Sequence, residues 1–381
     1  MNLDGVRILD LTRLLPGPFA TQLLQDMGAE VIKIESPGKG DYARYTPPYT
    51  DEGVGGLFST VNRGKRSVEL DLKSSEGKEV FYRLCGDVDV VIEQFRPNVK
   101  HRLEVDYESV REHNPDVVYC SLTGYGQNGR YSEKPGHDLN YEALGGLLGM
   151  TRSRVDPDGE AGNPVIPGYP VGDMSGGLYA AFAVVSGLLS REFGNGGEYI
   201  DVSMTDALLS FSQAALPDEY LGSGAGAGET ALTGKYPCYD VYEAEDGYVA
   251  LAAMEPKFWR KFCRTVGRQD LVTEHMNEDP ERREDLRKEL EELFSGRTRK
   301  EWVELDDVPI EAVNTLREAM ESPVTEGTTE PKAGVPRVSN PVCDDVEDGD
   351  VPSKGEDTEE ILKQAGFGDA EIDELRDKDV V

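Results

Sequence analysis

The feature that most constrains the fold is an alternation of short apolar strands and helices in the first third of the chain. The pattern predicts strands over residues 6–11, 30–34, 67–72, 88–92 and 117–122, and helices over 18–27, 75–85 and 107–113. Short turns separate these segments, and Gly28 marks one of the helix ends. Repeated β-α-β units with short connections predict a doubly wound, Rossmann-like parallel sheet.

A second, smaller domain is predicted in the C-terminal half. An irregular stretch rich in Gly and Pro, residues 123–172, suggests functional loops, and helices are predicted over 174–192 and 203–215. The Gly-rich run 222–228 is typical of a linker, and a hairpin over 239–253 with charged helical segments follows it. We therefore predict a large α/β domain over 1–221, completed by 330–381, and a linker with a small α+β domain over 222–329.

The charge balance restricts the partners of the chain. Acidic residues number 73 and basic residues 40, which gives a formal net charge of −33. Such an excess argues against binding to nucleic acid or to an anionic membrane surface. An acidic coat along the whole chain is typical of proteins from a salt-rich cytoplasm, where counter-ions screen the self-repulsion, so we expect a halophilic protein.

The cysteines and the N-terminal segment predict a cytoplasmic location. Five cysteines are widely spaced without a CxxC pair, which supports neither a disulfide framework nor a zinc site. The first residues, MNLDGVRILDL, lack a basic region followed by an apolar one, so no signal peptide is expected. The uncharged run 174–190 is short and rich in Gly and Ser, which favours a buried helix over a membrane span.

Seven motifs in order along the chain resemble the class III coenzyme A transferase family: GVRILDLTRLLPGPFATQLLQDMGAEVIKIE, NRGKRSVELDLKSSEGKEVF, VVIEQFRPNV, SLTGYGQNG, GHDLNY, GDMSGG and YIDVSMTDALL. Within that family, GHDLNY and the later AAMEPKFW are similar to the α-methylacyl-CoA racemase branch. The resemblance implies a large doubly wound domain and a small domain in two interlocked chains, hence a homodimer. It also implies an acyl-CoA substrate, with no cofactor beyond the coenzyme A moiety and no metal.

A cationic cluster is the candidate coenzyme A site. Arg63, Lys65 and Arg66 lie together in an otherwise acidic chain, and Arg96 and Arg102 follow the next predicted strand end. Coenzyme A carries a 3′-phosphate and a pyrophosphate, which a local cluster of cations would bind. Strand ends of an open α/β sheet are also where such ligands dock. The alternative is a solvated basic loop that makes ordinary surface ion pairs.

Asp173 is the candidate reactive residue. It follows Gly172 and precedes an apolar helix, so from the sequence alone it could be an N-cap whose carboxylate accepts backbone N–H groups. The resemblance implies instead that Asp173 is the reactive carboxylate. The N–H groups around Asp173 and Met174, at the positive end of the helix dipole, would then hold a thioester oxygen that gains negative charge.

His137 and Glu255 are the candidate partners of Asp173. His137 is one of four histidines and lies in the irregular Gly/Pro-rich stretch; a lone histidine is often structural, but the resemblance implies a catalytic acid/base. Glu255 follows an apolar strand, where the resemblance implies a carboxylate that supports the histidine. The alternative for Glu255 is a surface residue at a helix start. Asp206 is interpreted as a structural helix residue.

These residues predict an acyl-CoA racemase. His137 and Asp173 would act on opposite faces of the α-carbon of a 2-methylacyl-CoA, in a two-base 1,1-proton transfer. The first alternative is a CoA-transferase, in which Asp173 attacks the thioester and forms a mixed anhydride. The second is an acyl-CoA binding protein without turnover. No Walker loop or GxGxxG follows the first strand, which argues against nucleotide-driven chemistry.

Overall fold

The computed structural model describes residues 3–153, 162–222, 224, 226–325, 329–332, 335–343 and 349–381. Two compact units make up the chain. The larger consists of Met1–Gly145, Gly168–Phe211 and Gly327–Val381, and the smaller of Gly146–Pro167 and Ser212–Glu326. The predicted domain limits at 221 and 329 stay predictions, and the smaller unit also takes in residues 146–167 and 212–221.

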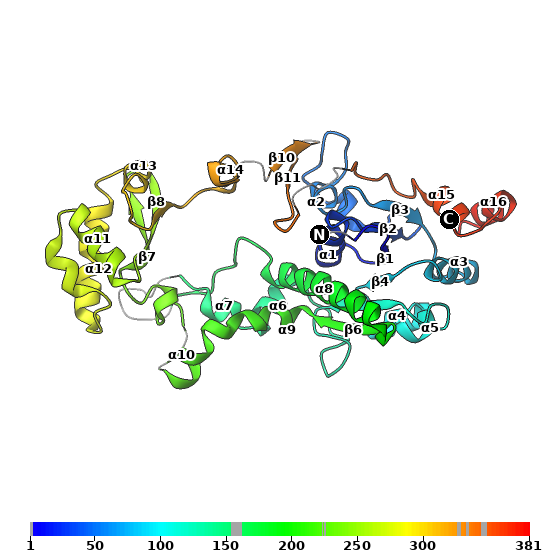
Figure 1. Ribbon diagram of the computed structural model, residues 1–381, viewed down its shortest axis with the longest axis horizontal. Helices are drawn as coiled ribbons and strands as arrows, with labels where there is room; N and C mark the ends of the chain where they lie inside the picture. Colours follow the sequence, from blue (N-terminus) through cyan, green and yellow to red (C-terminus); the bar gives the residue numbers. More distant parts are fainter. Residues whose placement is uncertain are drawn as a thin grey trace. The chain divides into compact units, whose positions relative to one another are not determined.

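The larger unit is built on a six-stranded parallel sheet of order β3-β2-β1-β4-β5-β6 (Figure 1). Its strands are β1 (Arg7–Asp10), β2 (Glu30–Glu35), β3 (Arg66–Glu69), β4 (Val90–Glu93), β5 (Val118–Thr123) and β6 (Glu198–Ser203). The predicted doubly wound sheet is thereby confirmed. The sequence missed β6 because EYIDVS is polar and only its last two residues are buried. The strand order reverses between β1 and β4, the crevice where α/β sheets bind ligands.

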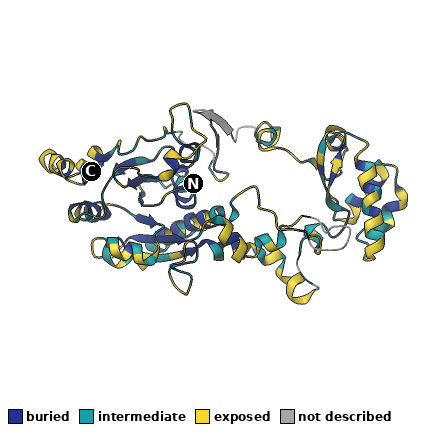
Figure 2. Ribbon diagram, turned by 180° about the vertical axis from the view of Figure 1, so that it is seen from behind, coloured by how far each residue is buried: buried dark blue, intermediate teal, exposed yellow. Residues whose placement is uncertain are grey.

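Alternate residues of the central strands enter two hydrophobic cores, one on each face of the sheet. Ile8 packs with α1 (Pro16–Asp26) and α8 (Val171–Ser190). Leu9 packs with α3 (Ser75–Cys85), α15 (Thr358–Gln364) and α16 (Asp369–Asp377). Figure 2 shows the central strands of this sheet as largely buried. This period-two burial on both faces is what a parallel sheet covered by helices requires.

Shorter elements complete the larger unit: η1 (Tyr42–Tyr45), α2 (Gly56–Val61), α4 (Pro97–Leu103), α5 (Tyr107–Arg111), α6 (Asp138–Leu144), η2 (Arg191–Asn195), α9 (Met204–Leu209), β10 (Thr329–Lys332) and β11 (Val335–Val338). The short helix η3 (Ser210–Ala214) begins in the larger unit and ends in the smaller one. The expectation of an irregular stretch over 123–172 was wrong for α6 and for α7 (Leu147–Met150). Glycines such as Gly145 and Gly146 interrupt these short helices and hide their periodicity. Residues 154–161 of that stretch lie outside the described residues.

The C-terminal segment packs along β3. Gly64 N–H donates to the Asp350 carbonyl over 2.9 Å, and the Asp357 carboxylate accepts from Ser67 N–H over 2.8 Å. Helix α15 lies in this segment and α16 follows it; the sequence did not predict α16, because Ile372 and Leu375 are its only buried residues. The last residues of the chain therefore belong to the core of the sheet domain.

The smaller unit is α+β, as predicted. Antiparallel strands β7 (Tyr239–Ala244), β8 (Gly247–Ala252) and β9 (Ile310–Ala312) form its sheet. Helices α11 (Pro256–Thr265), α12 (Pro280–Phe294) and α13 (Arg299–Val303) pack on it around an aromatic core that includes Trp259, Phe294 and Trp302. The remaining elements are α10 (Leu216–Leu221), η4 (Ala231–Thr233), η5 (Gln269–Glu274), α14 (Leu316–Met320) and η6 (Pro323–Thr325).

Helix α8 is unusually apolar. Together with the next turn it covers Val171–Asn195, and within the described residues this is the helix whose length and composition would allow a membrane crossing. Half of its most apolar window is buried inside the protein, as in the core helix of a soluble protein. Small residues permit this packing: a Cβ on Gly177 would lie 2.6 Å from the Pro16 carbonyl, and one on Gly176 would lie 2.4 Å from Met204.

Candidate active site

A pocket of about 290 Å³ lies at the carboxyl ends of β1, β2, β3 and β4. Apolar side chains such as Leu70 and Phe95 form part of its walls. Three exposed cations, Arg13, Lys73 and Arg102, also line it, and Arg13 stacks 5.2 Å from the Tyr42 ring centre. Apolar walls with several cations suit a ligand that combines an aromatic ring with phosphates.

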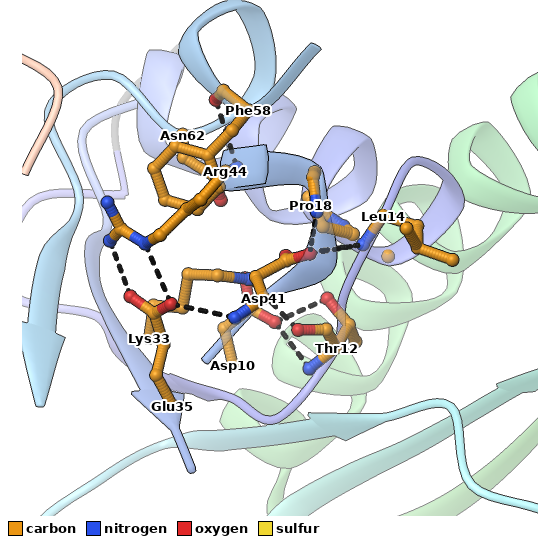
Figure 3. Close-up of polar contacts among 12 residues, drawn as sticks. Asp10, Thr12, Leu14, Pro18, Lys33, Glu35, Asp41, Arg44, Phe58 and Asn62 are labelled. Carbon is orange, nitrogen blue, oxygen red and sulfur yellow. Dashed lines mark hydrogen bonds and ion pairs between the residues drawn. The ribbon is translucent and has the colours of Figure 1, made fainter. Parts of the chain in front are cut away.

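A buried polar cluster adjoins this pocket (Figure 3). Lys65 Nζ lies 3.3 Å from Asp10 Oδ2, and Lys33 Nζ lies 3.0 Å from Asp41 Oδ2. Arg44 pairs with Glu35 over 2.5 Å. We call these six residues the balanced cluster, because three carboxylates face three cations. Burial would raise the pKa of Asp10, but Lys33 and Lys65 outweigh it and lower that pKa to about 2.

The balanced cluster shapes the loop that follows β1. The Leu14 N–H donates to Asp41 Oδ1 over 3.1 Å, and Leu14 holds a left-handed backbone with φ of 65°. The Lys33 ammonium also donates to the Thr12 carbonyl over 2.9 Å. A non-glycine residue in this conformation is strained, and the buried bonds to its neighbours compensate for that strain.

The structure separates the five predicted coenzyme A ligands. Lys65 is fully buried and bonds inside the protein to Asp10, Thr21, Asn62 and the Pro18 carbonyl. Arg63 is 8% exposed. Arg66 pairs with Glu30, Asp357 and Glu360, and Arg96 is exposed and donates to the Glu133 carbonyl.

Of these five, only Arg102 lines the pocket. The sequence analysis missed Arg13 and Lys73, although each follows closely on a strand at the carboxyl edge of the sheet, and that position was the available signal.

Asp173 lies in the first turn of α8. The helix begins at Val171 with Pro170 as its N-cap, so the interpretation of Asp173 as the N-cap is wrong. The Asp173 N–H donates to Asp138 Oδ1 over 2.9 Å, and the Met174 N–H donates to the Pro170 carbonyl over 3.0 Å. The two N–H groups expected to hold a thioester oxygen therefore already have acceptors inside the protein.

Three carboxyl groups meet at this end of α8. Asp138 and Glu142, both on α6, accept N–H groups from α8, and we call Asp138, Glu142 and Asp173 the acidic corner. Burial, followed by the charges of Asp138 and Glu142, raises the pKa of Asp173 to about 7. Within the described residues, no set of three His, Cys, Asp or Glu side chains is arranged to hold a metal ion. The sequence signal for this corner was the i, i+4 spacing of the two acids on α6.

His137 is the N-cap of α6, directly before Asp138. Its side chain is exposed, its N–H donates to Asn140 Oδ1 over 3.1 Å, and its carbonyl accepts the Asn140 N–H over 2.8 Å. The backbone around His137 is therefore rigid, and Asp138 connects it to Asp173. His137 and Asp173 thus belong to one corner of the larger unit, although their catalytic roles stay predictions.

Glu255 lies in the smaller unit, as the N-cap of α11. Its side chain is exposed, and its carbonyl accepts the N–H groups of Phe258 and Trp259. The support of His137 by Glu255 stays a prediction. Asp206 lies in the first turn of α9, where its N–H donates to the Ser203 hydroxyl over 3.2 Å.

Comparison with known proteins places this chain in a family of coenzyme A enzymes. A family model described as CoA-transferase family III matches residues 3–363. Succinyl-CoA:mesaconate CoA-transferase of Haloarcula hispanica is 37% identical over 76% of this chain and 74% of its own. Alpha-methylacyl-CoA racemase of Homo sapiens is 31% identical over 100% of this chain and 98% of its own. A crystal structure of a CAIB/BAIF family protein from Brucella suis has a TM-score of 0.82 at 30% identity, over 95% of this chain and 99% of that chain.

Proposed function

Because the chain belongs to CoA-transferase family III, and its relatives include both CoA-transferases and racemases, we propose that it is an acyl-CoA racemase. Its substrate would be a 2-methylacyl-CoA thioester. The observation that carries this proposal is that His137 directly precedes Asp138, whose carboxylate accepts the Asp173 N–H in the acidic corner. Two acid/base groups close together are what proton exchange at one carbon requires.

The state of Asp173 supports a proton-transfer role. A catalytic acid/base works best when its pKa lies near the working pH, and the pKa of Asp173 is about 7. The full-length match to racemases is a second support, since the transferase from Haloarcula hispanica is matched over 74% of its length and the human racemase over 98%.

The thioester makes the α-proton acidic, and the two residues would move it in both directions. One of the pair removes the α-proton, and the electron pair of that C–H bond moves into the enolate. The other group then delivers a proton to the opposite face of the carbon. In the reverse direction the two residues exchange roles, so neither is consumed.

The pocket at the carboxyl edge would bind the nucleotide of coenzyme A. Its apolar walls suit the adenine ring, and Arg13, Lys73 and Arg102 suit the 3′-phosphate and the pyrophosphate. We propose that no metal or cofactor takes part beyond the coenzyme A moiety of the substrate, because proton transfer next to a thioester needs only acid/base groups.

We also propose a homodimer in the cytoplasm. Leu178, Phe182, Leu189 and Phe193 expose large apolar surfaces along α8 and the turn after it, which a second copy of the chain would cover. The buried thiols Cys85, Cys120, Cys238 and Cys263 form no disulfide, which suits a reducing compartment. The acidic chain would contact neither nucleic acid nor membranes.

A CoA-transferase is the second candidate, favoured by the 37% identity to the Haloarcula hispanica enzyme. In that reaction the Asp173 carboxylate attacks the thioester carbonyl, the CoA thiolate leaves, and a mixed anhydride forms before CoA passes to the acceptor acid. A binding protein without turnover is the third candidate, and the raised pKa of Asp173 argues against it.

Deuterium uptake with a His137→Ala variant distinguishes these functions. The assay uses one enantiomer of a 2-methylacyl-CoA in deuterated water, without an acceptor acid. A racemase incorporates deuterium with loss of optical activity, and His137→Ala lowers that rate by roughly 10²–10⁴-fold. If no branched acyl-CoA exchanges its α-proton, while CoA passes to an added carboxylate, the transferase is the correct function. Neither reaction in the wild type would indicate a binding protein.

A further inference from the structure

Glu142 is a buried carboxylate that the proposed reaction does not use. With Asp138 it lies on one face of α6, at i and i+4. Glu142 Oε1 accepts the Val171 N–H over 3.1 Å, and Asp138 Oδ1 accepts the Asp173 N–H over 2.9 Å. The two carboxyl groups therefore hold two N–H groups of the first turn of α8.

Close packing fixes this contact. A Cβ on Gly172, between the two bonded residues, would lie 2.9 Å from Asp138 Oδ1 and 3.2 Å from the Tyr141 Cβ. The first turn of α8 thus fits against α6 only with glycine at this position. The orientation of Asp173 consequently depends on the carboxyl groups of α6.

The second oxygen of Glu142 needs a proton. Glu142 is 1% exposed, and within the described residues its Oε2 has no hydrogen-bond donor. Burial raises the pKa of Glu142, and the neighbouring Asp138 carboxyl raises it further. Two ionised carboxylates in contact would repel each other in a buried site, whereas a single shared proton gives each oxygen a partner.

We propose that Glu142 is a positioning residue, which shares one proton with Asp138 and together with it holds Asp173 in place beside a negative charge. This inference rests on the proposed role of Asp173. It extends that role by identifying the groups that set the orientation and the proton affinity of Asp173.

The surroundings of Asp173 agree with this role. The charges that act on it are the carboxylates of Asp138 and Glu142, which with burial raise its pKa to about 7. Burial and then Asp173 raise the pKa of Tyr141, the other titratable group of α6 that faces the corner. Two other helices contact the first turns of α8 with uncharged residues. Helix α1 does so through Pro16 and Phe19, and α9 does so through Met204. On α9, Asp206 lies in the first turn beside Ser203.

The test is a Glu142→Gln variant followed by NMR. Glutamine keeps an oxygen for the Val171 N–H and offers an N–H to Asp138, so the geometry survives while one ionisable group is lost. The protein is labelled with ¹³C at aspartate side-chain carboxyls, and the Asp173 signal is assigned by its absence in Asp173→Asn. In Glu142→Gln we expect the last proton of the acidic corner to dissociate at a pH roughly one unit lower than in the wild type, which corresponds to about 1.4 kcal/mol. The Asp173 carboxyl signal reports this dissociation.

Asp138→Asn tests the same pair from the other side and serves if Glu142→Gln does not fold. Its amide keeps an acceptor for the Asp173 N–H and donates to Glu142, so the same downward shift is expected. Asp206→Asn is the matched control, because it removes an acid from the equivalent first-turn position of α9 and should leave the Asp173 titration unchanged.

The outcomes separate the pair from the proposed function, because the titration needs no turnover. A shifted titration in a protein that acts on no acyl-CoA would support the pair and overturn the function. An unshifted titration in both variants, in an active enzyme, would overturn the pair and leave the function. In the active enzyme, we also expect the limb of the pH–rate profile that Asp173 sets to move with its titration.

Discussion

Two groups of carboxylates at the same edge of one sheet behave in opposite ways. The balanced cluster, with Asp10 at its centre, matches each acid with a cation, and the pKa of Asp10 falls to about 2. In the acidic corner the two groups that act on Asp173 are both carboxyl groups, and the pKa of Asp173 rises to about 7. Both groups are largely removed from water, so the difference comes from their neighbours and not from burial alone.

The two groups differ in what they do: the balanced cluster stabilises the fold, and the acidic corner is the candidate site of the reaction. Buried charges with partners hold the loop after β1 and the walls of the pocket in place. Buried acids without a neighbouring cation destabilise the folded state. Proteins keep such destabilising groups at sites where a reaction requires a shifted pKa.

Asp173→Asn should abolish function without loss of the fold. Turnover should fall by at least roughly 10²–10⁴-fold, because the acid/base or nucleophile is removed. The melting temperature should rise, and more at pH 8 than at pH 5. The folded pKa lies above the unfolded value of 3.8, so ionised Asp173 costs stability above pH 3.8 and costs most above pH 7. Steady-state assays and thermal unfolding at both pH values check this.

The matched control for that variant is Asp206→Asn, which should alter neither turnover nor the pH trend. An Asp173→Asn protein with wild-type activity would show that the reactive group lies elsewhere. A lower melting temperature of Asp173→Asn at pH 8 would show that the corner stabilises the protein in the same way as the balanced cluster.

Lys65→Met should have the opposite effect and lower the free energy of unfolding. It leaves Asp10 buried without its closest cation, and removing one partner of a buried ion pair costs about 3–5 kcal/mol. Urea unfolding measures the loss. Lys78→Met is the control, because the Lys78–Glu104 pair lies at the surface, with its side chains 21% and 59% exposed, and should contribute about 0–1 kcal/mol. Equal losses in the two variants would contradict the role given to the balanced cluster.

The loss of wild-type stability at low pH, its acid limb, also tests the role of the balanced cluster. Because the folded pKa of Asp10 is below its unfolded value, Asp10 contributes stability above pH 3.8 that is lost as the pH falls towards 2. Thermal unfolding between pH 5 and pH 2 should show this loss. A Lys65→Met protein with the wild-type acid limb would exclude Lys65 as a cause of the lowered pKa of Asp10.

Arg102→Ala should act on binding and not on the fold. A charge-assisted contact to phosphate is worth about 1.5–3 kcal/mol, so KM for acyl-CoA should rise by roughly 10–150-fold. Arg66→Ala is the contrast: Arg66 pairs with Asp357, so its loss should lower the melting temperature and leave KM nearly unchanged. Initial-rate kinetics measure KM for both variants. A raised KM in Arg66→Ala alone would indicate that coenzyme A binds at the basic cluster predicted from the sequence.

The smallest effect is expected from salt. The net charge of −33 should destabilise the protein in dilute buffer, where the Debye length is roughly 30 Å, and much less near 1 M salt, where it is about 3 Å. The melting temperature should therefore rise from dilute to molar KCl. Salt screens exposed charges more than buried ones, so the acidic corner should keep its titration at both salt concentrations. Equal melting temperatures would remove the expectation of a halophilic protein.

The sequence by itself determined most of the sheet and gave the candidate residues of the site. The alternation of strand and helix patterns predicted five of the six strands, because burial leaves a short apolar or alternating run in each and short turns bound it. It failed for β6 and for α16, whose few buried residues give a weak pattern. The motifs also made Asp173 and His137 the candidate site residues, since both lie in short segments whose order along the chain is distinctive.

Only the tertiary structure decided which charges face each other. Lys65 and Arg102 look alike as basic residues near strand ends, yet one is buried against Asp10 and the other lines the pocket. Asp138 and Glu142 look like ordinary helix-surface acids, yet α8 covers them and turns them towards Asp173. A pKa or an ion pair depends on distances between segments far apart in the chain, and local sequence patterns carry no information about those distances.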